Sequence, residues 1–167
     1  MVVTKEQLED TLEEELFGWK QLVILGVGNE FGGDDSLGLS ASRKLKEALT
    51  GISGVEVLAV GNAPENFTGL IRRLSPSHIL LIDAAEMGET AGTIKLVEAH
   101  QIEGMMPSTH TLSLSMLVKY LEQELGSKVL ILGMQPKSLY FGTSLSTEVE
   151  GSINNLLLML KGLLIRY

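Results

Sequence analysis

Residues 22–38 read LVILGVGNEFGGDDSLG, and this stretch decides the fold class. Its first six residues form an unbroken apolar run, which is typical of a strand buried on both faces of a parallel sheet. A turn rich in Gly and Asp follows at residues 28–36, and apolar residues then recur at helical spacing over residues 37–49. The stretch therefore predicts a strand, a turn and a helix in that order.

The same alternation of apolar strands and amphipathic helices continues to the end of the sequence. Further strands are expected at residues 55–60, 78–82 and 129–132, a weaker edge strand at 93–97, and helices at 67–74, 111–125 and 146–164. This order predicts an α/β fold, a three-layer αβα sandwich around a mostly parallel, twisted sheet of about five strands.

An acidic extension, residues 1–20, precedes the first strand. Thr4 begins a capping-box pattern, after which leucines recur every four residues at Leu8, Leu12 and Leu16. We expect an amphipathic helix here, ahead of a single α/β domain at residues 21–167. The leucine stripe must be buried either against that domain or against a second subunit, so a homodimer through this helix stays open.

Composition excludes several classes of function. The 167 residues include 13 Lys and Arg against 21 Asp and Glu, a net charge of −8, which argues against binding nucleic acid or anionic lipid. The absence of Cys excludes disulfides, iron–sulfur clusters, thiolate zinc sites and cysteine catalysis. The sequence has neither a secretory signal nor about 18 uninterrupted apolar residues, so we expect a cytoplasmic protein without membrane insertion.

The chemistry is expected at the carboxyl ends of the strands, where open α/β sheets bind their ligands. Asp35 follows the first strand, Asp83 ends the third, and His110 directly precedes a helix. Two carboxylates and one imidazole could hold a divalent metal or act as an acid/base group, and both alternatives stay open. Other polar residues expected at this edge are Asn29, Asp34, Asn62, Glu65, Glu86, Thr109 and Gln135.

Asp35 also has a purely structural explanation, as the N-cap of the following helix, although Ser36 could fill that role equally well. A nucleotide site is disfavoured, because the two acids would repel a pyrophosphate and Phe31 replaces the third glycine of the dinucleotide fingerprint. No Ser lies in a Gly-x-Ser-x-Gly elbow, so hydrolysis by activated water is favoured over an acyl-enzyme.

Five blocks of the sequence stand out: GVGNEFGGDDSLG at 26–38, APEN at 63–66, DAAEMG at 83–88, THTLSL at 109–114 and GMQP at 133–136. In order and spacing they resemble the NiFe-hydrogenase maturation endopeptidases. The APEN block and the Asp pair are most similar to the branch that processes hydrogenase-3, the formate-hydrogenlyase-type or group 4 enzymes.

The resemblance implies an endopeptidase that removes the C-terminal extension of a hydrogenase large-subunit precursor after nickel insertion. It implies that Asp35, Asp83 and His110 are catalytic and contact the nickel of the precursor, and that the enzyme binds no cofactor tightly. Supporting roles would fall to Gly28, Asn29 and Asp34. A nickel-binding maturation chaperone without proteolysis, a nucleotide-binding module and a spore-protease-type peptidase remain alternatives. Three scattered His and no Cys argue against the chaperone.

Overall fold

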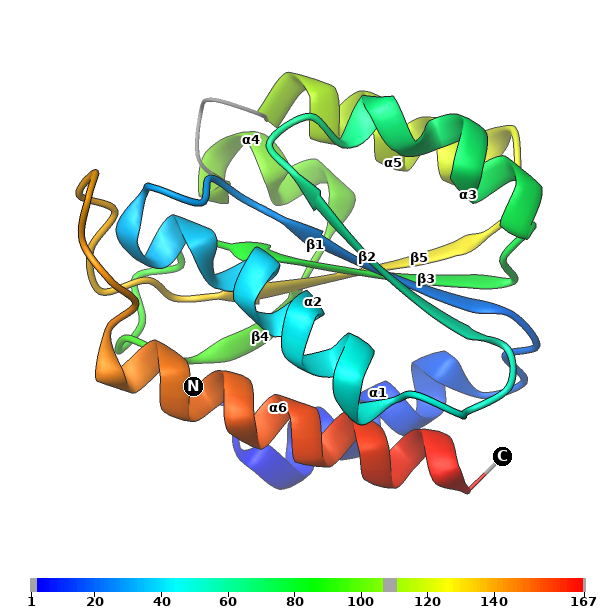
Figure 1. Cartoon of the computed structure of the whole chain (residues 1–167), viewed down its shortest axis with the longest axis horizontal. Coiled ribbons are helices and arrows are strands. Elements are labelled where there is room, and N and C mark those ends of the chain that lie inside the picture. The colour runs from blue at the N-terminus through cyan, green and yellow to red at the C-terminus, as the bar shows by residue number, and fades with distance from the viewer. Residues whose placement is uncertain (1–2, 107–110, 167) are drawn as a thin grey trace.

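The computed structural model describes residues 3–106 and 111–166 (Figure 1). Five strands form one sheet in the order β2-β1-β3-β5-β4, in which β4 is antiparallel to β5 and the other pairs are parallel. The strands are β1 (Leu22–Val27), β2 (Val55–Gly61), β3 (His78–Ala84), β4 (Ile94–Val97) and β5 (Lys128–Met134). The α-helices are α1 (Lys5–Leu16), α2 (Leu37–Ala48), α3 (Thr68–Leu74), α4 (Ile102–Met105), α5 (Thr111–Gln123) and α6 (Thr147–Ile165).

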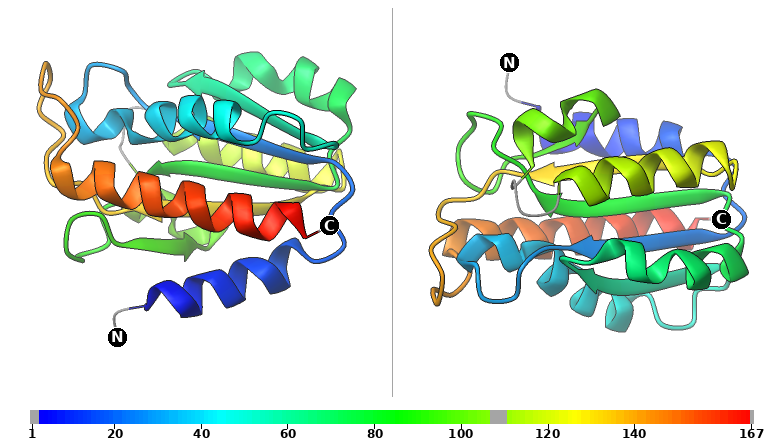
Figure 2. Two further views of the ribbon diagram at one scale, coloured as in Figure 1. Left: turned by 60° about the horizontal axis from the view of Figure 1, so that its bottom comes forward. Right: turned by 90° about the horizontal axis from the view of Figure 1, so that it is seen from above.

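Helices cover both faces of the sheet and confirm the predicted three-layer α/β architecture. The helices α1, α2 and α6 lie on one face, and α3, α4 and α5 lie on the other (Figures 1 and 2). Along β1, Leu22 and Ile24 join the first of these two cores, whereas Val23 and Leu25 join the second. Because both faces are buried, the strand needs apolar residues at every position, which explains its unbroken run.

The edge strand predicted near residue 95 is present as β4, but three short stretches differ from expectation. The turns after β1 and β2 each contain a 3-10 helix, η1 (Gly33–Ser36) and η2 (Pro64–Phe67). The segment after β4, where no helix or strand was predicted, contains η3 (Ala99–Gln101) and α4. Only Ile102 of these residues is fully buried, so the segment shows no helical periodicity that the sequence could reveal.

The acidic extension folds as α1 and packs on its own chain. The predicted capping box is formed by Thr4 with Gln7, and the leucine stripe is buried in the same core as α6. Figure 2 shows α1 running beside α6, and Arg166 pairs there with Glu9 and Glu13. The leucine stripe is therefore buried against its own domain, and the homodimer remains a prediction.

Within the described residues, no helix combines the length and apolar character required to cross a bilayer.

Candidate active site

The turn after β1 closes because Gly28 has no side chain. Its φ of 147° lies in the region that favours glycine, and a Cβ there would lie 2.0 Å from the carbonyl oxygen of Asp35. The Asn29 amide donates to that same carbonyl at 3.2 Å, and Asn29 Oδ1 accepts from the Phe31 amide at 3.1 Å. Gly28 and Asn29 thus fold the turn back onto η1, which carries the two acids.

A second glycine brings α2 against the ends of two strands. A Cβ on Gly38 would lie 2.1 Å from the carbonyl oxygen of Val27 and 2.5 Å from that of Ile82. The first turn of α2 therefore contacts both β1 and β3, and η1 also contacts β3. Because Asp35 lies two residues before α2 and Asp83 follows Ile82, the two acids reach the same edge of the sheet.

Both acids are buried at this edge, Asp35 with 6% and Asp83 with 0% of its surface exposed. Asp83 Oδ1 accepts from the Ala84 amide at 2.8 Å. The N-cap explanation of Asp35 is wrong, because α2 begins at Leu37 and its N-cap residue is Ser36. Ser36 does not cap with its side chain either, since its hydroxyl donates to the carbonyl oxygen of Gly33 at 2.7 Å. Carboxylates are rarely this buried, which makes the edge a candidate active site.

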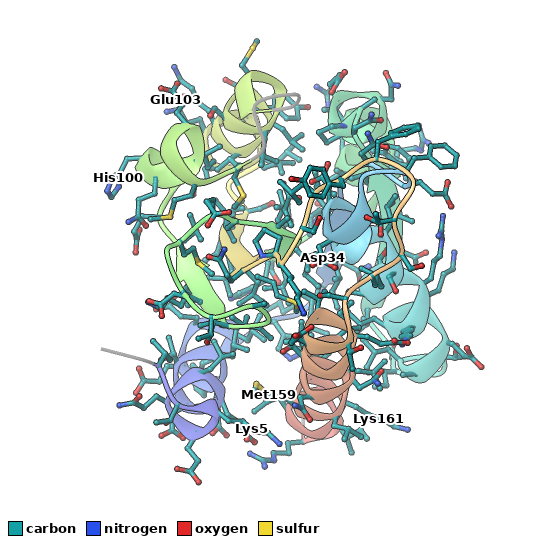
Figure 3. All side chains as sticks on the ribbon, turned by 90° about the vertical axis from the view of Figure 1, so that its left-hand side faces the viewer. Lys5, Asp34, His100, Glu103, Met159 and Lys161 are labelled. Carbon is teal, nitrogen blue, oxygen red and sulfur yellow. The ribbon has the colours of Figure 1, made fainter. Side chains whose placement is uncertain are left out.

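The third expected member, His110, lies outside the described residues, so the structure does not test the predicted triad. Within residues 3–106 and 111–166, no three His, Asp or Glu side chains come together as a metal site. The other two histidines lie elsewhere. Figure 3 shows His100 at the periphery of the molecule, away from Asp34. His78 is the first residue of β3, so it lies at the other end of the strands from Asp83, and burial lowers its pKa there.

Asp34 has a different environment from Asp35 and acts as an anchor for a distant loop. Its side chain accepts from the Lys137 amide at 2.8 Å, the Ser138 amide at 3.2 Å, and the amide and hydroxyl of Ser146 at 2.7 and 2.8 Å. Figure 3 shows Asp34 between the turn after β1 and the loop after β5. The supporting role implied for Asp34 stays a prediction, and these contacts are structural.

Gln135 connects the ends of β5 and β3 in a similar way. Its Oε1 accepts from the amides of Met87 at 2.7 Å and Glu89 at 3.3 Å. Its Nε2 donates to Glu86 Oε1 at 2.7 Å and to the carbonyl oxygen of Pro136 at 3.2 Å. One buried amide therefore fixes the loop that follows Asp83.

Comparison with known proteins identifies the family. The family model described as hydrogenase maturation protease matches residues 39–161. The chain belongs to the hydrogenase maturation protease family. A Methanocaldococcus jannaschii sequence named among these proteases is 36% identical over 86% of this chain and 88% of its own length. The hydrogenase 3 maturation protease of Escherichia coli K12 is 33% identical over 84% and 88%.

A solved structure supports the same assignment. The crystal structure of a NiFe hydrogenase maturation protease from Thermococcus kodakarensis KOD1 superposes with a TM-score of 0.84 and 28% identity, covering 93% of this chain and 99% of that one. The resemblance found from five sequence blocks, and the peptidase class that it implied, are confirmed.

In this maturation protease a small hollow opens beside Ala84 and Ala85, the two residues that follow Asp83. Its volume is about 90 Å³, and it lies between the end of β3, α4 and the loop after β5. Its walls are mostly apolar, with Glu86 at the rim, and they include Ala84, Ala85, Met105, Met106, Pro136 and Leu139. Because Ala84 directly follows Asp83 in β3, the hollow lies at the same end of the sheet as the two buried acids.

Two features of this edge were missed from the sequence. The four hydrogen bonds to Asp34 join segments more than a hundred positions apart, and no local pattern reveals them. The apolar run at residues 139–141 was also passed over, although three consecutive apolar residues inside a polar loop were a usable signal.

Proposed function

We propose that this protease removes the C-terminal extension of a hydrogenase large-subunit precursor after nickel has entered the precursor. One observation carries the proposal at the level of the site: Asp35 and Asp83 are both buried at the carboxyl ends of the adjacent strands β1 and β3. Membership of the maturation protease family supports the same reaction.

In this proposal Asp35, Asp83 and His110 recognise the nickel that the precursor carries. Carboxylate oxygen and neutral imidazole are ligands that suit a divalent ion, and three of them leave coordination positions for groups of the precursor. With so few ligands the enzyme binds the ion weakly, which fits a checkpoint that releases it with the product. The nickel is therefore part of the substrate and not a resident cofactor.

The chemical step is hydrolysis of one peptide bond. The nickel polarises the scissile carbonyl or activates the attacking water, as divalent ions do in other hydrolases. A carboxylate of the pair accepts the proton of the water, and the departing amine takes up a proton as the C–N bond breaks.

The test is a mixing assay with the purified large-subunit precursor, with and without nickel, followed by mass spectrometry. Loss of a C-terminal peptide from the nickel-loaded form alone is the expected result. The variants Asp35→Asn, Asp83→Asn and His110→Ala should each slow cleavage strongly. Asp10→Asn on the exposed face of α1 is the matched control and should cleave at the wild-type rate.

Other outcomes would contradict defined parts of the proposal. Cleavage with and without nickel would keep the protease and refute nickel recognition by the three residues. Wild-type rates for both Asp83→Asn and His110→Ala would refute their roles. Nickel transfer without cleavage would favour the chaperone alternative.

A further inference from the structure

We propose that Phe31, Tyr140 and Phe141 form a docking platform for the folded body of the hydrogenase large-subunit precursor, beside the candidate active site. This inference rests on the function proposed above and adds the surface that holds the substrate. We call these three side chains the aromatic platform.

The platform consists of large rings that the fold leaves in solvent. Phe31, Tyr140 and Phe141 are 62%, 78% and 79% exposed. The rings of Phe31 and Phe141 come from segments far apart in the sequence, yet their centroids lie 6.0 Å apart. The whole chain has only four Phe, three Tyr and one Trp, so this gathering is a marked concentration. Grouped exposed rings are typical of protein contact surfaces, where aromatic residues contribute much of the affinity.

The platform is held in place by hydrogen bonds beneath it. The Gly142 amide donates to the carbonyl oxygen of Phe31 at 2.7 Å, and the Asp34 amide donates to the carbonyl oxygen of Ser138 at 2.9 Å. Gly33 allows the two segments to touch, because a Cβ there would lie 2.5 Å from Thr143 Oγ1. A surface fixed in this way loses little conformational entropy on binding, which favours docking.

The position of the platform identifies the occupant. Leu139, next to Tyr140, is itself part exposed and lines the hollow at the end of β3. An apolar surface therefore continues from the platform into the hollow at the candidate active site. Under the proposed function, a precursor whose C-terminal segment reaches this end of the sheet presents its neighbouring surface to the platform.

Two charged residues close to the platform in the chain, Glu30 and Lys137, are paired within the protein. Glu30 pairs with Arg43 at 2.9 Å on one side, and Glu148 pairs with Lys137 at 2.7 Å on the other. The complementary surface is therefore apolar and not strongly charged. Figure 1 shows the loop between β5 and α6, which carries Tyr140 and Phe141, projecting beyond the first turn of α6.

The test compares precursor cleavage by Phe31→Ser, Tyr140→Ser and Phe141→Ser, singly and together, with cleavage by Phe17→Ser. Phe17 is 74% exposed, but it lies after α1 at the opposite edge of the sheet, which makes it a matched control. We expect the KM for the precursor to rise about tenfold or more in the triple variant, with little change in kcat. Phe141→Leu, which keeps an apolar side chain, should restore part of the loss. Circular dichroism should show each variant folded, since the rings are exposed.

Each other outcome overturns the inference. A wild-type KM in the triple variant would refute the platform and leave the proposed function intact. A wild-type enzyme that cleaves no precursor would remove both. If light scattering finds a wild-type dimer that the triple variant loses, with KM unchanged, the occupant is a second copy of this chain.

Discussion

Replacing Asp34 by Ala tests whether this acid is a structural anchor. Its side chain is only 1% exposed and accepts four hydrogen bonds from the loop after β5. In the Ala variant the amides of Lys137, Ser138 and Ser146 lose the carboxylate that accepts from them. We therefore expect the loop to detach and the protein to lose stability.

The magnitude follows from the number and kind of these bonds. A hydrogen bond to a charged group contributes about 1.5–3 kcal/mol, and bonds that share one acceptor do not add fully. Water reaches part of the vacated site, so we expect a loss of about 4 kcal/mol in the free energy of unfolding. For a domain of this size that is a fall of roughly 8–16 °C in the unfolding midpoint. Asp34→Asn should lose about half as much stability. Its remaining oxygen can still accept hydrogen bonds, but its NH₂ group replaces the other oxygen and faces an N–H donor.

The assay is urea unfolding followed by circular dichroism, with a thermal scan as a second measurement. Asp10→Ala, on the exposed face of α1, is the control and should change stability by less than about 0.5 kcal/mol. A loss below about 1 kcal/mol in Asp34→Ala would refute the anchor. If such a stable variant also failed to cleave the precursor, Asp34 would belong to the catalytic machinery.

Three further perturbations test other contacts. Gly38→Ala forces a Cβ against two strand carbonyls and should destabilise the protein by about 3 kcal/mol in the same assay, whereas Gly162→Ala, in open space on α6, should be neutral or stabilising. Gln135→Ala should speed hydrogen exchange at the amides of Met87 and Glu89, which donate to its side-chain oxygen. Exchange at these amides as slow as in the control Gln123→Ala would contradict the inference that Gln135 fixes this loop. Burial, and then a nearby lysine, lower the pKa of His78 below its ordinary value of 6.5, so the unfolded chain binds more protons than the folded one just below that pH. Stability is then complete above about pH 6.5 and falls as the pH drops through the lowered pKa, and the difference in unfolding midpoint between about pH 7.5 and about pH 5 should shrink in His78→Gln.

The fold was predictable because its strands are buried on both faces. In β1, Val23 and Ile24 enter opposite cores, so the apolar run is continuous and cannot be mistaken for a surface strand. The short α4 was not predictable, because a single helical turn that buries one residue fully leaves no period to read. The expectations therefore held for the extensively buried strands and failed for the single helical turn of α4.

The candidate site was only partly predictable. The strand-end rule selected Asp35 and Asp83, and the structure buries both at one edge of the sheet. The same rule could not separate Asp34 from Asp35, because their difference depends on Ser146, which is 112 positions away from Asp34. Adjacent side chains in a 3-10 turn point in different directions, and only the tertiary fold decides which direction meets the loop.

The pairing of α1 with α6 has a consequence for the order in which the protein matures on the ribosome. The leucines of α1 share one core with Leu156, Leu160 and Leu163 of α6, and Arg166 reaches Glu13 across 153 positions of sequence. Because α1 is synthesised long before α6, part of its apolar stripe stays uncovered until α6 emerges. During translation the opposite core, which is covered by α3, α4 and α5, can close first. A chain stalled before α6 would expose apolar leucine side chains of α1, which chaperones and proteases recognise.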